Sequence, residues 1–499
     1  MQRSTALGLI AATVLATCPA AQAAPALHFG PCPEDVSTPY PELRCAGLDV
    51  PLDHADPAAG TVRLLISRLP ARDPATRRGA LLTNPGGPGG PGIAFAGSLS
   101  RRLPDAVLNS YDLIGVDIRH TAHSTPIHCV DAATYWRAPL PDPDAEAARE
   151  RNWRRAAEYA AGCAQRAGRY LPHLTTPTIA RDLDLVREAL GEQRISFLGY
   201  SWGTYLGAVY GRLFPHRVDR MVLDSVVDPS RVWYANNLAQ DVAVQRRLGR
   251  YFDWVARHHG TFGLGADRER VHSAWRAVRA ELRRAPRGPL GPSELIGTTF
   301  TALYGEDDWI RLAEALAAFH LRGDDRPLVG MVVPKDAAAE NANAIYNAVE
   351  CADAPWPADR ATWERDAAAM ARHSPLAAWY NLWSVAPCRT WPAPSGQPVR
   401  ITGAGLPPVL LLNSVHDVAT PYAGALRMHR ALPSSVLVTE RDSGAHGLYA
   451  MAGNAEIDRI GTDYLVRGSL PAGDVAVPGH PKPDPAAPGP PRGRQLVLR

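Results

Sequence analysis

Residues 195–213 read ISFLGYSWGTYLGAVYGRL, and they give the strongest indication of the architecture. Its start is mostly apolar and favours a buried strand, whereas residues 204–213 favour a helix. The pentapeptide Gly199-Tyr200-Ser201-Trp202-Gly203 lies between them. A Gly-x-Ser-x-Gly motif between a strand and a helix is typical of a sharp turn that exposes a nucleophilic serine. The alternative is a plain turn in which Ser201 only caps the helix.

Further apolar runs predict strands on both sides of this motif, at Val62–Leu69, Gly79–Thr83, Tyr111–Ile118, Val218–Asp224, Pro408–Asn413 and Ser435–Thr439. A helix is predicted before the motif, with Thr176 as its N-cap, Pro177 as its first residue and Gly191 as its stop. Strands that alternate with helices indicate a mostly parallel sheet that is covered on both faces.

Residues 231–390 have a different pattern, with amphipathic helical stretches, and nine of the twelve Trp lie between Trp233 and Trp391. We interpret them as a helical cap inserted into an α/β domain formed by residues 27–230 and 391–470. Most of these Trp are expected to pack between helices. Residues 471–499 are rich in Pro and predict an extended or disordered tail without a catalytic role.

Residues 1–23 have the features of a secretory signal peptide. Arg3 is followed by an apolar run, residues 6–16, that is too short to span a bilayer, and Ala21-Gln22-Ala23 offers a cleavage site. We therefore predict a secreted protein. A lipid anchor on Cys18 is the alternative and would be its only stable link to a membrane.

The composition excludes one class of partner and leaves assembly open. A formal net charge of +3 is too small for a nucleic-acid binder. Oligomeric state is not predicted. The six cysteines after the signal peptide are an even number, which predicts disulfides in an exported chain, although they allow 15 pairings. Pairing of sequence neighbours is favoured, namely Cys32–Cys45, Cys129–Cys163 and Cys351–Cys388. No Cys-x-x-Cys pair is present, so no metal site is predicted.

Two later loops supply the partners that a serine nucleophile needs. Asp417 follows the strand predicted at 408–413, and His446 lies in a Gly-flanked loop after the last strand. Chain order then makes His446 the general base and Asp417 the group that orients it. His416 and Asp442 are the alternative base and acid.

A Gly-rich loop, residues 84–92 (NPGGPGGPG), follows the strand predicted at 79–83. Backbone N–H groups of such a loop can stabilise an oxyanion. We assign this role to Gly87 together with the N–H of Trp202. A rigid Pro/Gly turn is the alternative, and the many Pro and the lack of a Gly-Lys-Ser/Thr sequence argue against phosphate binding.

Together these motifs resemble the α/β-hydrolase superfamily, and more narrowly the secreted tripeptidyl aminopeptidases of actinomycetes in the proline iminopeptidase-like serine peptidase family. The resembling stretches are residues 84–92, 117–126, 175–229, 409–422 and 444–447. The resemblance implies an α/β-hydrolase fold, with a mostly parallel central sheet and an inserted helical cap domain. It also implies the triad Ser201, Asp417 and His446 and the oxyanion hole of Gly87 and Trp202.

Two stretches depart from the family pattern. Residues 117–124 read DIRHTAHS, so that both glycines of the usual Asp-x-Arg-Gly-x-Gly-x-Ser are replaced. In the usual Leu-Asp-Gly after the sixth strand, Ser225 replaces the glycine.

The predicted activity is two-step acyl transfer without a cofactor, in which short peptides, expected to be tripeptides, are removed from free N-termini. An aminopeptidase must bind an α-ammonium group, which calls for a carboxylate. Candidates are Glu350 and Asp353 beside Cys351, and the acidic run 306–308, although solvated surface acids are the alternative reading. A secreted carboxylesterase and a non-catalytic binding protein are the alternative functions.

Overall fold

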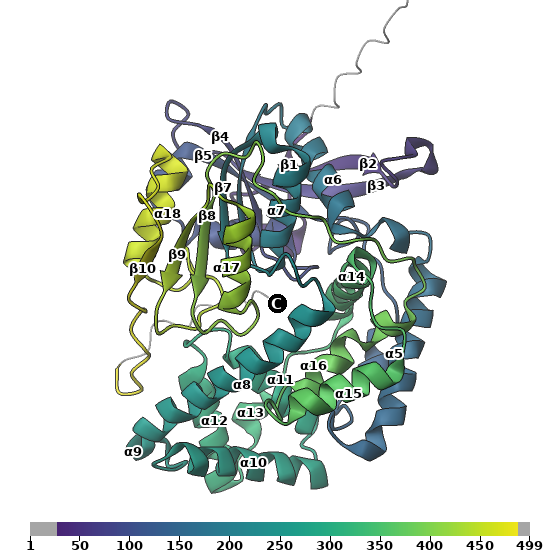
Figure 1. Cartoon of the computed structure of the whole chain (residues 1–499), viewed down its shortest axis with the longest axis vertical. Coiled ribbons are helices and arrows are strands. Elements are labelled where there is room, and N and C mark those ends of the chain that lie inside the picture. The colour runs from purple at the N-terminus through teal and green to yellow at the C-terminus, as the bar shows by residue number, and fades with distance from the viewer. Residues whose placement is uncertain (1–26, 488–499) are drawn as a thin grey trace, which may run out of the picture.

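The computed structural model describes residues 27–487, and its centre is one ten-stranded sheet with the order β1-β2-β3-β5-β4-β6-β7-β8-β9-β10 (Figure 1). The strands are β1 (Gly30–Pro31), β2 (Arg44–Pro51), β3 (Thr61–Leu69), β4 (Gly79–Asn84), β5 (Tyr111–Asp117), β6 (Ile195–Tyr200), β7 (Val218–Asp224), β8 (Leu410–Ser414), β9 (Val436–Glu440) and β10 (Val475–Val477). From β5 to β10 all neighbours are parallel, whereas β1–β2, β2–β3 and β3–β5 are antiparallel.

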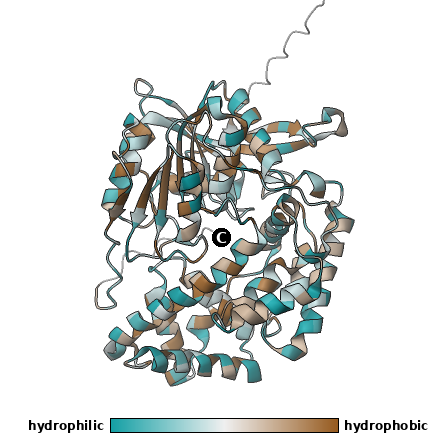
Figure 2. Ribbon diagram, in the orientation of Figure 1, coloured by the Kyte–Doolittle hydropathy of each residue, from teal (hydrophilic) through white to brown (hydrophobic). Residues whose placement is uncertain are grey.

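Helices cover both faces of the sheet, which confirms the predicted layers. One face carries α6 (Thr176–Ala189), α7 (Trp202–Leu213) and α17 (Tyr422–Ala431), and the other carries α2 (Gly92–Ser100), α3 (Asp105–Ser110) and α18 (Ala455–Arg467). Figure 2 shows the strands as the most hydrophobic part of the ribbon. The strands therefore supply the core, and their carboxyl ends lead into the loops that carry the predicted catalytic residues.

The helix before the serine motif begins one residue earlier than the sequence predicted. Thr175 is the N-cap, and its Oγ1 accepts a hydrogen bond from Thr178 N. Thr176 and Pro177 are therefore the first two residues of α6. Either threonine offers the same capping hydroxyl, and because Pro is tolerated in the first turn it does not fix the register of the start.

Residues 231–390, here called the helical half, contain the helices below the sheet in Figure 1. They are α8 (Tyr234–Arg257), α9 (His259–Phe262), α10 (Arg268–Arg284), α11 (Pro292–Ala302), α12 (Trp309–Arg322), α13 (Arg326–Val329), α14 (Ala337–Asp353), α15 (Arg360–Ala371), α16 (Ala378–Val385) and the 3-10 helix η4 (Ala386–Thr390). Trp254, Trp309 and Trp363 are fully buried between these helices, as expected for packing residues.

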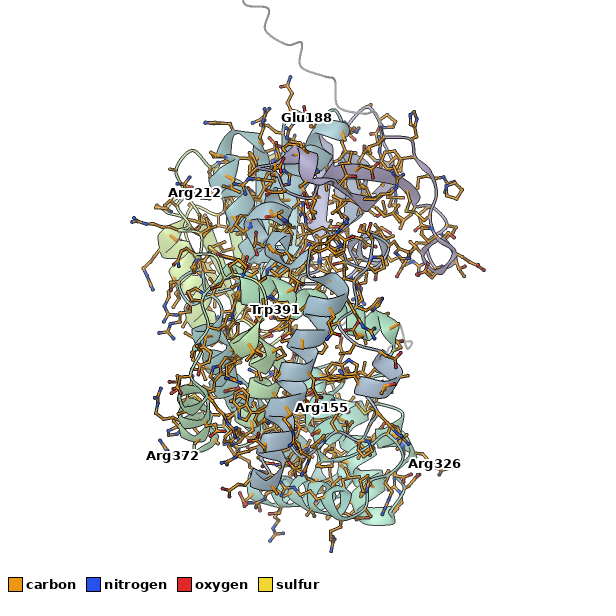
Figure 3. The ribbon with its side chains drawn as sticks, turned by 90° about the vertical axis from the view of Figure 1, so that its right-hand side faces the viewer. Arg155, Glu188, Arg212, Arg326, Arg372 and Trp391 are labelled. Atoms are coloured by element: carbon orange, nitrogen blue, oxygen red, sulfur yellow. A yellow bond between two sulfur atoms is a disulfide. The ribbon has the colours of Figure 1, made fainter. Side chains whose placement is uncertain are left out.

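The division between the halves is less sharp than the sequence indicated. Helix α5 (Glu146–Ala167) precedes the serine motif, yet its Trp153 packs edge-on against Trp363 of α15. The C-terminal part of α5, which includes Tyr159, belongs instead to the hydrophobic core that packs against the sheet. Trp391, labelled in Figure 3, packs partly against the core clusters of both halves. A short helix α4 (Ala132–Tyr135) precedes α5, and α1 (Glu34–Ser37) lies near the start of the described chain.

The described part of the Pro-rich tail, residues 471–487, contains one extended strand and packs against the protein. Strand β10 pairs in parallel with β9. His480 then bridges Glu440 of β9 and Glu306 of the helical half, and Lys482 also pairs with Glu306. The segment is rich in Pro, but its short apolar strand and its two cations attach it to the rest of the protein. Residues 475–484 are here called the C-terminal strap.

The cysteines pair as sequence neighbours. The structure contains the disulfides Cys32–Cys45, Cys129–Cys163 and Cys351–Cys388, with Cα–Cα distances of 4.8, 4.0 and 4.9 Å. The predicted signal peptide and Cys18 lie outside the described residues. Within residues 27–487, no helix combines the length and apolarity needed to cross a membrane.

Candidate active site

Ser201 occupies a sharp turn between β6 and α7. Its φ and ψ are 57° and −127°, a strained conformation for a residue with a side chain. A Cβ on Gly199 would lie 2.5 Å from Gly203 O, and one on Gly203 would lie 2.7 Å from Asn84 Oδ1. Only glycine fits at either position, which explains the spacing of the motif. Ser201 Oγ caps no helix N–H, so the capping alternative has no support.

The Gly-rich loop lies directly against this turn. A Cβ on Gly86 would lie 2.5 Å from Tyr200 O, 2.9 Å from Ser201 Cβ and 3.2 Å from Trp202 N. Gly86 donates its own N–H to Asn84 Oδ1, at 2.9 Å. Trp202 begins α7, so its N–H has no partner within the helix. Gly87 is the next residue of this loop and has a φ of +109°, and the role of its N–H belongs to the proposal below.

His446 and Asp417 form a buried pair. His446 Nδ1 lies 2.9 Å from Asp417 Oδ2 and 3.0 Å from Oδ1. The carboxylate also accepts hydrogen bonds from Ala419 N at 2.8 Å, Thr420 N at 2.9 Å and Thr420 Oγ1 at 3.0 Å. These donors hold the carboxylate in one orientation. A fixed carboxylate on Nδ1 directs the lone pair to Nε2, which is the atom that a general base uses.

The second ring nitrogen of His446 and the alternative base His416 have different surroundings. His446 Nε2 is buried and makes no hydrogen bond among the described residues, so its contact with Ser201 Oγ belongs to the proposal below. The alternative base His416 donates its backbone N–H to Ser443 O. Among the described residues, the Asp417 carboxylate has a hydrogen bond with the ring of His446 and none with the ring of His416. Burial, with the nearby Arg250, lowers the pKa of His416 to about 4.

The helical half faces these loops. The Tyr304 ring packs edge-on against the His446 ring, with 5.1 Å between ring centroids, and Tyr304 O accepts the His446 N–H at 2.7 Å. Gln240 of α8 donates its side-chain amide to Ala419 O at 2.6 Å. Sequence reasoning missed both residues, because Gln240 resembles any polar residue of a helix and Tyr304 stands without a motif in the connection between α11 and α12.

Of the five candidate amine-binding carboxylates, Asp307 is exposed and Asp308 is half-buried, whereas the other three are buried and differ in what they contact. Asp353 is satisfied by Thr176 N at 2.7 Å, Thr176 Oγ1 at 2.6 Å and Trp233 Nε1 at 3.2 Å, a structural link between α14 and α6. Glu306 is paired with Arg247, His480 and Lys482. Both acids therefore already have the partners that a buried carboxylate needs.

Glu350 is the exception. It is 4% exposed, and burial raises its pKa to about 8, while hydrogen bonds from Tyr346 and Asn237 act in the opposite direction. No cation is among the groups that set its pKa. Tyr346, which hydrogen-bonds Glu350, also lies close enough to Tyr304 for the two to interact electrostatically. Through these two tyrosines, Glu350 is connected to the ring that packs on His446.

A second acid of this kind was missed by the sequence analysis. Asp241 of α8 is 2% exposed, and burial raises its pKa to about 7. Its Oδ1 accepts from Asn381 Nδ2 at 3.2 Å, and Asn381 also contacts Asn237 O at 3.2 Å. One helix turn thus separates Asp241 from the asparagine that contacts Glu350. An acid inside an amphipathic helix looks like a solvated residue until the helix that covers it is known.

The fold and the serine turn define the class of this protein as an α/β hydrolase. A family model described as "TAP-like protein" matches residues 374–477. The chain is 42% identical to a tripeptidyl aminopeptidase of Streptomyces lividans over 93% of this chain and 89% of that protein. It is 30% identical to the serine protease Hip1 of Mycobacterium tuberculosis, over 86% of each chain. It is 31% identical to carboxylesterase B of the same species, over 86% of this chain and 85% of that one.

The chain therefore belongs to the tripeptidyl aminopeptidase-like family of α/β hydrolases. Within this family it is a serine aminopeptidase, a hydrolase that acts on peptides.

Proposed function

We propose that this protein is a secreted aminopeptidase that releases short peptides, expected to be tripeptides, from free N-termini through an acyl-enzyme. Ser201 is the nucleophile, His446 the general base and Asp417 the residue that orients it. The N–H groups of Gly87 and Trp202 form the oxyanion hole. The carrying observation is the buried Asp417–His446 pair, with the oxyanion loop packed against Ser201.

The chemistry follows from these positions. His446 Nε2 removes the proton of Ser201 as its Oγ attacks the scissile carbonyl, and Asp417 stabilises the imidazolium that forms. The two N–H groups stabilise the oxyanion. His446 then protonates the leaving amine, and in the second step it activates a water molecule that releases the acyl group from Ser201.

Glu350 supports an aminopeptidase over an esterase. A buried carboxylate without a cation is costly to charge, and an α-ammonium group would supply the missing partner. The helical half then acts as a cap that places this carboxylate at a set distance from Ser201. That distance determines how many residues are released.

Secretion is supported by the three disulfides, which form and persist in oxidising compartments. The proposal includes cleavage of the signal peptide after Ala23. N-terminal sequencing of protein from the culture medium tests it, because a mature chain that begins at Ala24 is the expected result. A lipid-modified Cys18 in the membrane fraction would contradict it.

The activity is tested with chromogenic amides of one, two and three residues, each with a free and an acetylated N-terminus, and with a simple ester. We expect cleavage of free-amine tripeptide amides and none of the acetylated series. Ser201→Ala should abolish turnover without lowering the melting temperature by more than a few degrees. Turnover of the ester alone would move the assignment to a carboxylesterase, the activity for which one relative is named.

A further inference from the structure

The loops that carry the proposed nucleophile and base meet at one dipeptide, Asp224-Ser225, at the end of β7. The N–H of Ser201 donates to the backbone carbonyl of Asp224 at 3.0 Å. The N–H of Gly447, next to His446, donates to Ser225 Oγ at 2.7 Å. The same two residues thus hold the backbone of both reacting groups.

The side chain of Asp224 extends this contact along the histidine loop. Its carboxylate accepts hydrogen bonds from Leu448 N, at 2.9 and 3.0 Å, and from Tyr449 N, at 2.7 Å. Ser225 Oγ also lies 3.2 Å from Asp224 Oδ1. Three successive N–H groups after His446 therefore end on one dipeptide. Both of its residues are fully buried, where each lost hydrogen bond leaves an unsatisfied group.

The backbone of Ser225 is strained. Its φ is +59°, a left-handed conformation that glycine adopts freely and that a residue with a side chain rarely adopts. Its N–H donates to Leu412 O of β8 at 2.8 Å, which ties the turn to the next strand. Glycine would relieve the strain and keep this backbone bond. What glycine cannot supply is the hydroxyl that accepts the Gly447 N–H.

We propose that Ser225 is a positioning residue for His446, and that its hydroxyl sets the height of the imidazole above Ser201. The inference rests on the proposed triad, and it goes beyond that triad by assigning a role to a fourth side chain. Ser225 itself does not contact the reacting atoms. Its effect passes through the backbone of Gly447 to the neighbouring ring.

The test compares Ser225→Gly and Ser225→Ala with Ala450→Gly. Both serine variants lose the hydroxyl, but only Ser225→Gly also relieves the strain. Ala450 has a φ of +57° in the same loop and contributes no side-chain hydrogen bond, so its glycine variant is the matched control for strain. The readouts are kcat and KM on a tripeptide amide, the rate of labelling of Ser201 by a fluorophosphonate, and the melting temperature.

We expect both serine variants to lose about tenfold to a hundredfold in kcat and in labelling rate, the scale of a small misplacement of a catalytic group. KM should stay unchanged, and Ser225→Gly should melt at a higher temperature than Ser225→Ala, because only glycine also relieves the strain. The acid limb of the pH profile of kcat/KM should shift in both serine variants and remain in place in Ala450→Gly.

Two outcomes would overturn the inference, and they are distinguishable. If Ser225→Gly is labelled and turns over at the unmodified rate, the positioning role is wrong and the triad stands. If the unmodified enzyme is not labelled at Ser201, the proposed triad fails and the inference fails with it. Labelling needs no peptide, so it is independent of the aminopeptidase assignment.

Discussion

At the scale of single residues, a buried carboxylic acid without a cationic partner changes how the stability of the folded protein depends on pH, in addition to any role in binding. Burial raises the pKa of Glu350 from 4.5 to about 8. Between these values the folded protein holds a proton that the unfolded chain has released, so this residue lowers stability as pH rises through the window.

Replacement of Glu350 by Gln removes that titration. We therefore expect the melting temperature of Glu350→Gln, relative to the unmodified protein, to rise between pH 5 and pH 8, at about 1.4 kcal/mol per unit of pKa shift. KM for free-amine substrates should rise as the ammonium partner is lost. A flat difference across this pH range would contradict the burial argument, and an unchanged KM would contradict the amine-binding role.

The residues also show what the sequence could and could not predict. Ser201 stands in a motif between an apolar strand and a helix, and Gly199 is required by a contact with Gly203 in the same motif, so the turn was predictable. His446 and Asp417 followed from strand order. The surroundings of Glu350 and Glu306 were not predictable from the sequence. No cation is among the groups that set the pKa of Glu350, whereas Glu306 pairs with three cations from segments that are distant in sequence.

At the scale of elements, the disulfide Cys351–Cys388 ties the end of α14 to η4, directly beside Glu350. Replacing both cysteines by Ser should lower stability by about 2–4 kcal/mol. It should also raise KM for free-amine substrates, because the carboxylate loses its fixed support. Denaturant titration and steady-state kinetics measure the two effects.

The matched control is the disulfide Cys32–Cys45 at the far edge of the sheet, which joins the residue after β1 to β2. Its removal should lower stability without any change in KM. An equal rise of KM in both double variants would show that general loosening, and not the position of α14, is responsible.

The edge strands explain where prediction of the fold stopped. The seven strands with dense apolar runs were predicted within two residues of their observed limits. Strand β2 was not predicted, because its residues alternate between buried and exposed and include an internal Gly and a terminal Pro, so that it lacks a continuous apolar run. Strand β10 has three residues, and its existence depends on the open edge of β9.

At the scale of the whole molecule, the C-terminal strap adds pH-dependent stability. Burial acts to lower the pKa of His480, but Glu306 and Glu440 outweigh it and raise the value from 6.5 to about 9. The strap contribution is therefore complete below pH 6.5 and is lost as pH rises through about 9.

His480→Gln should consequently lower the melting temperature at pH 6 and by clearly less at pH 10. Thermal unfolding followed at several pH values measures this. His320, exposed on α12, is the control, and His320→Gln should leave the curve unchanged. A loss of equal size at both pH values would mean that His480 contributes through packing and not through its charge.

The chain passes between the two halves several times: along α5, before α8, after η4 and again in the C-terminal strap. A single linker can serve as a hinge, but a connection repeated at this many places resists wide opening. Substrates must then enter with the two halves in place. We expect the enzyme to trim loose peptides and frayed chain ends, and to leave tightly folded proteins intact until other proteases have opened them.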